Sequence, residues 1–144
     1  MGTKSIREIV ETALVAQLTA QTELSGVNIE KGIEVDKLQL PSVIVSCENV
    51  APAPDLPEGL GNYACTVNIA TFTSADEATA LTVHRARSAA VLGAMQDVTA
   101  IKALFTSQAD ATCYDVIYQS VDQSNGDRAL GSMAVFTVLA VLPA

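Results

Sequence analysis

The sequence contains no tryptophan and few aromatic residues of any kind. Aromatic residues make up 4% of the 144 residues, whereas hydrophobic residues as a class make up 49%. The core must therefore be built from alanine, valine, leucine and isoleucine, a composition that suits regular layers of helix on sheet. It lacks the aromatic anchors that are common in pockets for small ligands.

Positive charge is also scarce. The sequence contains sixteen acidic residues and only eight lysines and arginines, which gives a net charge of −8 and a sequence pI of about 4.4. The cations occur as scattered pairs, such as Arg85 with Arg87, among acidic residues. Binding to a phosphate backbone needs several clustered cations, so the sequence argues against direct nucleic-acid binding. The acidity indicates either simple solubility or a surface that repels DNA, such as a channel wall.

Residues that bind metals or perform catalysis are few. His84 is the one histidine, and Cys47, Cys65 and Cys113 are far apart with no CxxC pair. A structural zinc site needs four such ligands at short spacings, so we expect no metal and no cofactor, and we expect the thiols to be buried and free, in a reducing compartment. GxGxxG, P-loop, GxSxG and HExxH motifs are missing. We interpret His84 as a surface residue of a helix, and we expect no catalytic residue and no enzyme activity.

Long apolar runs are missing as well. The start of the chain, Met-Gly-Thr-Lys-Ser, has no apolar signal-peptide segment, and no run reaches the roughly 18 apolar residues of a membrane span. The length fits one domain over residues 1–144. We therefore expect a soluble single-domain protein that is made in the cytoplasm and does not contact a membrane.

The most informative feature that is present lies at the end of the sequence. Residues 112–142 read as two long strands joined by a tight turn at 123–128, in which Asn125-Gly126 is a strong turn signal. The second strand is apolar on both faces: one carries Leu130, Ala134, Phe136, Val138, Ala140 and Leu142, and the other carries Ala129, Met133, Val135, Leu139 and Val141. A small antiparallel sheet usually has one wet face, and a helix layer covers only one. We therefore expect the second face to meet another protein chain, as in a building block of an assembly.

Helix and strand signals alternate in the first half of the sequence. The apolar period of 5–22 predicts an amphipathic helix, and Ser5 with Glu8 forms a capping box at its start. Strands are predicted at 27–34 and at 42–50, the second of them opened by a proline.

A proline-rich loop follows at residues 51–61. It contains three of the five prolines and two glycines, so no regular element runs through it. Prolines hold a loop extended and lower the entropy lost when it docks on a partner, and Leu56 and Leu60 would be its apolar contacts. The alternative is an ordinary long hairpin loop, and the sequence leaves both interpretations open.

The second half of the sequence begins with a strand at 62–73, where apolar and polar residues alternate. A long helix is predicted to follow, capped by Ser74 with Glu77 and ending near residue 95. Its acidic first turn, Asp76 and Glu77, would complement the helix dipole. The helix stripe expected to face the sheet contains Ala78, Leu81, Arg85, Ser88, Ala89, Leu92 and Met95. A short helix near 98–105 then leads to the final hairpin.

The resulting element order is α-β-β-β-α-(α)-β-β. Runs of strands interrupted by helices favour an α+β fold, with a mostly antiparallel sheet and helices packed on one face.

The order of these elements over nearly the whole chain resembles that of the tail terminator (tail-completion) proteins of tailed bacteriophages and prophages. The segments that carry the resemblance are the N-terminal helix, the strand opening Leu40-Pro-Ser-Val-Ile-Val45, the Pro/Gly loop, the strand Tyr63–Thr71, the helix start Ser74–Ala78 and the C-terminal hairpin. One departure is Gly32, which interrupts the first strand.

The resemblance implies a structural virion protein that is not an enzyme. Such proteins form a hexameric ring at the head-proximal end of the tail tube, stop tube polymerisation and provide the head–tail joining surface. The implied partners are further copies of the chain, the tail-tube protein and the head–tail connector protein, in the tail or neck of a virion assembled in the host cytoplasm. DNA would pass through the ring without specific binding. Six copies at −8 each would carry −48 together, and we expect acidic residues to face the channel.

We expect the subunit and partner contacts to come from the loop, the hairpin tip and the doubly apolar strand. The candidate interface residues are Leu56, Leu60, Asn125, Arg128, Val135 and Val141.

Two other functions remain open at this point. The first is a tail-tube or head–tail connector subunit, which would also assemble around DNA. The second is a small oligomeric α+β enzyme or ligand-binding module whose site lies between subunits, with His84, Arg85, Arg87 and Asp115 as its candidate residues.

Overall fold

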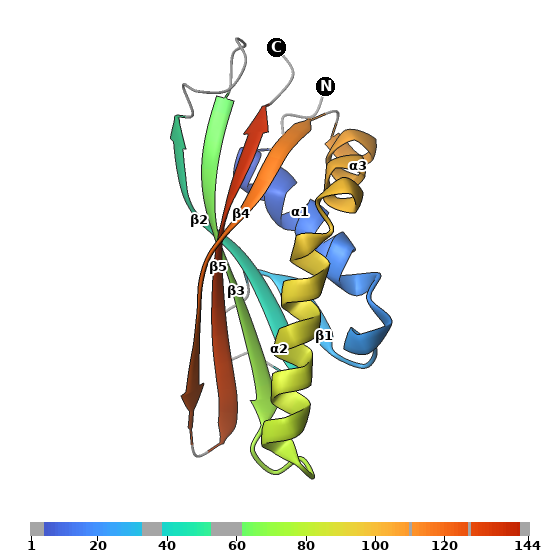
Figure 1. Ribbon diagram of the computed structural model, residues 1–144, viewed down its shortest axis with the longest axis vertical. Helices are drawn as coiled ribbons and strands as arrows, with labels where there is room; N and C mark the ends of the chain where they lie inside the picture. The colour runs from blue at the N-terminus through green and yellow to red at the C-terminus, as the bar shows by residue number, and fades with distance from the viewer. Residues whose placement is uncertain (1–4, 33–38, 53–61, 110, 127, 142–144) are drawn as a thin grey trace.

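The computed structural model describes residues 5–32, 39–52, 62–109, 111–126 and 128–141. Within these ranges the chain forms a five-stranded mixed sheet with three α-helices packed on one face (Figure 1). In chain order the elements are α1 (Ile6–Thr19), a 3-10 helix η1 (Thr22–Leu24), β1 (Asn28–Lys31), β2 (Ser42–Pro52), β3 (Asn62–Ser74), α2 (Ala80–Gln96), α3 (Val98–Ala109), β4 (Thr112–Asn125) and β5 (Ala129–Val141). The predicted α+β class and element order are confirmed.

The strand order in the sheet is β1-β2-β3-β5-β4. All neighbours are antiparallel except β1 and β2, which run parallel. The C-terminal strand β5 therefore lies inside the sheet, paired along its whole length with β3 from Ser74↔Ala129 to Asn62↔Val141. Because β5 lies inside the sheet, one of its two apolar sets of side chains lies on each face of the sheet.

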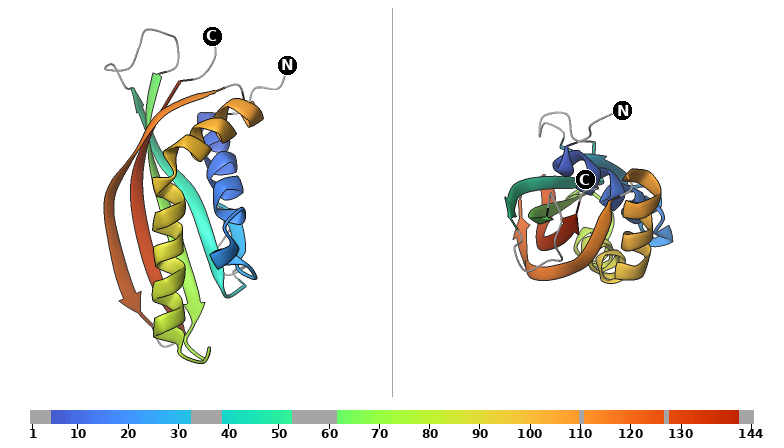
Figure 2. Two further views of the ribbon diagram at one scale, coloured as in Figure 1. Left: turned by 45° about the vertical axis from the view of Figure 1, so that its right-hand side comes forward. Right: turned by 90° about the horizontal axis from the view of Figure 1, so that it is seen from above.

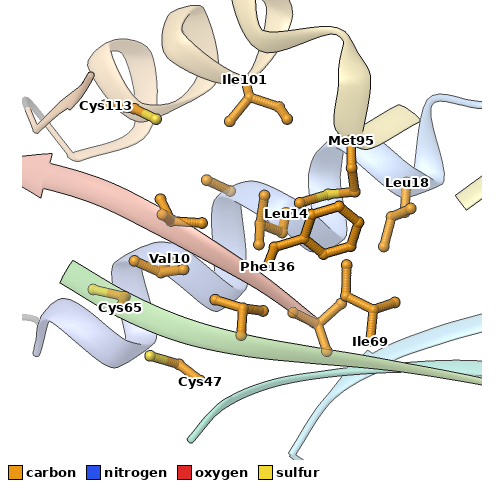
Figure 3. Packing of buried hydrophobic residues seen from close by; sticks show 14 of the residues in the cluster. Val10, Leu14, Leu18, Cys47, Cys65, Ile69, Met95, Ile101, Cys113 and Phe136 are labelled. Atoms are coloured by element: carbon orange, nitrogen blue, oxygen red, sulfur yellow. The ribbon is translucent and has the colours of Figure 1, made fainter. Parts of the chain in front are cut away.

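The three helices together cover one face of the sheet. Figure 2 shows all three on the same side of the sheet, with α2 along the half that contains the β4–β5 turn and α1 with α3 over the other half. Apolar residues of these helices and of the sheet form one core (Figure 3). Phe136 of β5 lies in this core among Leu14, Met95 and Ile69. The face of β5 that carries Leu130, Phe136 and Ala140 is therefore the one that the helices cover.

The start of α1 shows the serine half of the predicted capping box. The Ser5 hydroxyl accepts a hydrogen bond from the Glu8 backbone N–H at 3.1 Å, which satisfies one of the free donors at a helix N-terminus.

The start of α2 differs from the prediction. β3 continues to Ser74, which pairs with Ala129, and α2 begins only at Ala80, so the expected capping box and acidic first turn are wrong. The N-cap is Thr79, whose φ of 51° is left-handed and whose side chain makes no capping bond. Strand pairing with β5 outweighs the local capping signal, because Ser74 is the last residue that the β3–β5 ladder pairs.

The face of α2 that packs on the sheet also differs from the predicted stripe. His84, Val91, Ala94 and Met95 are the buried residues of this helix. Of the predicted stripe only Met95 is among them, whereas Leu81, Arg85 and Ala89 are exposed. The buried stripe runs through a histidine, which is why an apolar pattern search misplaced it.

Candidate interface on the outer face of the sheet

The outer face of the sheet, meaning the face that points away from the three helices, carries the second set of β5 side chains. Ala129, Val135, Leu139 and Val141 are half-buried there, and Met133 is 38% exposed. The first set, from Leu130 to Ala140, is buried under the helices as expected. Among the residues that the structure describes, no helix covers this row of apolar side chains inside the sheet.

The neighbours of this row are small and mostly uncharged. Val135 lies between Asn68 of β3 and Ser120 of β4 in the strand register. Thr137 accepts a hydrogen bond from Gln119 Nε2 at 3.1 Å. The charged residues on β4 that flank the row are Asp115 and Asp122, which pair with Leu139 and Met133. On its β4 side the apolar row is therefore flanked by polar side chains and by two aspartates.

A shallow hollow opens on the outer face near the β4–β5 turn. It has a volume of about 160 Å³ and is lined by Ala70, Phe72, Asp122, Gln123, Ser124, Gly131, Ser132 and Met133. Gly131 pairs directly with Phe72, and a Cβ at Gly131 would come within 3.5 Å of the Phe72 ring. Since the glycine has no side chain to occupy this space, the Phe72 ring forms part of the apolar lining of the hollow. We call this feature the outer-face hollow.

The edge strand β4 is poorly suited to pairing with another strand. Its register with β5 shifts between Cys113 and Asp115 and again between Tyr118 and Ser120. Such bulges, together with exposed acidic side chains, are common devices that prevent edge-to-edge association. Contacts through the faces of the subunit are favoured over extension of the sheet along this edge.

The structure separates the residues that the sequence suggested as contacts. Val135 and Val141 both lie on the outer face, whereas Arg128 is exposed in the turn at the opposite end of β5 from Val141 (Figure 1). The Arg128 carbonyl accepts a hydrogen bond from Ala75 N at 3.0 Å, and Asn125 pairs with Leu130 at the end of β4. Leu56 and Leu60 lie outside the described residues.

His84 is completely buried, so its interpretation as a surface residue is wrong. Its Nδ1 lies 2.9 Å from Thr73 Oγ1 of β3, and its Nε2 lies 2.7 Å from Ser132 Oγ of β5. A hydroxyl either donates or accepts, so both ring nitrogens of a neutral histidine are satisfied. The ring thus fixes α2 to two neighbouring strands by hydrogen bonds in addition to apolar packing.

An ion pair extends this buried network to the surface. Arg87 donates two hydrogen bonds to the Glu77 carboxylate, at 2.9 and 3.0 Å, and a third to Thr73 Oγ1 at 3.2 Å. The bidentate geometry fixes the turn before α2 against the helix. His84 and Arg87, two of the candidates for an enzyme site, therefore make hydrogen bonds that hold α2 to the sheet and to the turn before it. The third, Arg85, is exposed on α2, away from this network.

The buried histidine makes stability depend on pH. Burial lowers the pKa of His84 and nearby Arg87 lowers it further, although a hydrogen bond with the Gly131 backbone opposes them. The stabilising contribution is complete above the unfolded pKa of about 6.5 and is lost as pH falls through the lower folded pKa, because the unfolded chain then binds a proton that the folded protein does not.

We expect the free energy of unfolding, measured with urea between pH 7.5 and 5.5, to fall by up to about 1.4 kcal/mol per pH unit because of His84. The variant His84→Gln should be less stable at pH 7.5 but should lack this component, and parallel profiles for the two proteins would contradict the assignment.

The three cysteines are buried and free, as predicted. Burial raises the pKa of Cys113 to about 11, and the neighbouring Cys47 thiol raises the pKa of Cys65. Cys113 and Cys65 are therefore protonated and unreactive at neutral pH. Within the described ranges, no group of three or more His, Cys, Asp or Glu side chains could hold a metal ion, and no helix there has the length and apolarity needed to span a membrane.

Comparison with known proteins adds a fold-level likeness. No protein-family model matches the sequence, and no curated protein matches it. A chain in a solved structure described as "Virion of native gene transfer agent (GTA) particle" is similar, with a TM-score of 0.65 and 17% sequence identity. The likeness covers 91% of this chain and 93% of that chain. The α+β fold of this protein is thus also the fold of a chain in that gene transfer agent virion.

Proposed function

We propose that the protein is a structural subunit of a phage-like virion, and that six copies form a tail-terminator ring at the head-proximal end of the tail tube. The observation that carries the proposal is the apolar outer face of β5, which the helices of the same subunit do not cover. Contiguous exposed apolar surface on a small protein marks an interaction site. A full-length likeness to a chain from a virion supports the same conclusion.

The shape of the subunit supports a ring as the form of the proposed assembly. The outer face lies opposite the helix layer (Figure 2), so two copies that bring these unlike surfaces together make a heterologous contact. Repeated contacts of this kind close into a ring when the rotation between neighbours divides a full turn. The family resemblance supplies the number six, with one domain of residues 1–144 in each subunit.

The remaining surfaces would serve the two partners of the ring. The turn with Asn125 and Arg128, and the loop with Leu56 and Leu60, are the candidate contacts to the tail-tube protein and to the head–tail connector protein. The six described cations are dispersed over α1, β1, α2, α3 and the β4–β5 turn, which fits DNA passing through the ring without specific binding. The protein would act in the neck of a virion assembled in the host cytoplasm, and catalysis has no part in this role.

The mass of the native particle tests the proposal most directly. We expect native mass spectrometry to give a particle of six 15.0 kDa chains, about 90 kDa, and negative-stain microscopy to show single rings. Long tubes would instead identify a tail-tube subunit. A protein that remains strictly monomeric at high concentration would contradict the assembly role altogether.

A further inference from the structure

An exposed flank of α2 carries a ridge with a single charge. Leu81, Arg85 and Ala89 follow one another at four-residue spacing and are all exposed, and Leu81 is 40% exposed. Residues four apart on a helix lie on the same side, one above the other. We call these three residues the α2 ridge. No hydrogen bond or ion pair of Arg85 is found among the residues that the structure describes.

The α2 ridge and the outer-face hollow lie at the same level of the subunit, on opposite sides of it. The link between them is His84, which is next to Arg85 in α2 and bonds Ser132 of β5 at 2.7 Å. The two neighbours of Ser132 on the strand, Gly131 and Met133, line the hollow on the other face of the sheet. The helix α2 and the sheet therefore lie between the ridge, with its leucine and arginine, and the apolar hollow, with its aspartate.

We infer that the outer-face hollow is the seat for the α2 ridge of the next copy of this chain, with Leu81 in the hollow and Arg85 paired with Asp122. The inference rests on the proposed ring and specifies its subunit contact. The hollow has a volume of about 160 Å³, and Ala70, Phe72 and Met133 in its lining offer apolar contacts to an aliphatic side chain.

Charge complementarity identifies a second copy as the occupant. The exposed side of α2 offers one cation in an otherwise uncharged surface, and the hollow offers one anion, Asp122, beside apolar residues. A rotation about an axis parallel to the strands would bring the α2 ridge of one subunit to the outer-face hollow of the next. The two subunits would not need to shift along the strand direction. The same contact then recurs around the ring until it closes.

Reversing the two charges tests the pairing. Arg85→Asp and Asp122→Arg should each raise the protein concentration at which the ring half-dissociates by at least about tenfold, because each places like charges together. The double variant Arg85→Asp/Asp122→Arg should restore it to within about threefold of the wild type. The matched control reverses two exposed charges elsewhere, Lys102→Asp and Glu23→Arg, and should leave sedimentation velocity profiles unchanged.

Disulfide trapping gives a second, independent readout. Leu81→Cys with Met133→Cys places the two thiols on opposite faces of one subunit, so a disulfide between them must join neighbouring copies. With oxidised glutathione as oxidant, we expect a ladder of linked chains on a non-reducing gel. The control Leu40→Cys with Met133→Cys uses a leucine that is as exposed as Met133, at 38%, and should give no ladder.

The possible outcomes distinguish a failure of the inferred contact between ridge and hollow from a failure of the proposed ring. A wild-type ring whose single charge variants assemble normally, or whose Leu81/Met133 cysteines do not link, overturns the inferred contact and leaves the ring in place. A wild-type monomer overturns both.

Discussion

Replacing Phe105 with alanine is expected to cost about 3–5 kcal/mol of unfolding free energy, the range measured for large aromatic side chains removed from protein cores. Phe105 is completely buried and belongs to α3, the helix that packs on α1 and on β4. The cavity would open where three elements meet, so local collapse would not fill it. For a chain of this size the loss corresponds to a fall of about 10–17 °C in Tm.

The matched control is Tyr118→Ala. Tyr118 is 57% exposed and contacts one ring, that of Phe136, at a centroid distance of 5.9 Å. We expect its removal to cost about 1 kcal/mol, the contribution of an aromatic pair. Urea unfolding of both variants at one protein concentration measures the difference, because ring formation makes the apparent stability depend on concentration. Equal losses for the two variants would contradict the assigned core.

The elements that the sequence predicted well are those set by local pattern. Apolar alternation placed β3 to within one residue of its observed end, and the Asn125-Gly126 signal placed the final turn. The strand β5 was recognisable because its apolar residues occupy both alternating sets, and the structure gives each set its own environment. These signals depend on neighbours within a few residues, which a single sequence displays directly.

The errors on α2 come from interactions that are distant in the sequence. The Ser74–Glu77 pattern is a valid capping box, yet β3 pairs with β5 as far as Ser74↔Ala129, and that ladder decides where the helix begins. His84 lies on the buried stripe with Val91 and Met95, at a helical spacing that the sequence does contain. Its burial depends on a hydroxyl 48 residues away, that of Ser132, and no local pattern reveals that partner.

The candidate interface was predicted in part. The apolar face that contains Val135 and Val141 follows from the sequence. The outer-face hollow does not, because it exists only where the strand register places Gly131 opposite Phe72. Arg85 looked like a member of the sheet-facing stripe, and only the direction in which His84 points shows that the arginine faces outward.

Val135→Asp is expected to convert the ring into folded monomers. Val135 is half-buried in the middle of the outer face, between Asn68 and Ser120, so in a single subunit an aspartate there has polar neighbours and access to water. In the ring, the same carboxylate would be buried against the next subunit without a cation, and an unpaired buried charge is among the most costly changes at an interface. We expect the ring to weaken at least about a hundredfold, which corresponds to about 2.8 kcal/mol.

Two controls separate this effect from a general loss of stability. Val135→Thr keeps the shape of valine and introduces no charge, so it should weaken the ring far less. Leu40→Asp introduces the same charge at a leucine outside the strands of the outer face, and it should leave the ring intact. Circular dichroism should show all three variants folded, and native mass spectrometry should find monomers for Val135→Asp alone. Because the carboxylate is harmful only where a second chain excludes water, a Val135→Asp protein that still forms rings would show that the apolar face of β5 is not where the subunits meet.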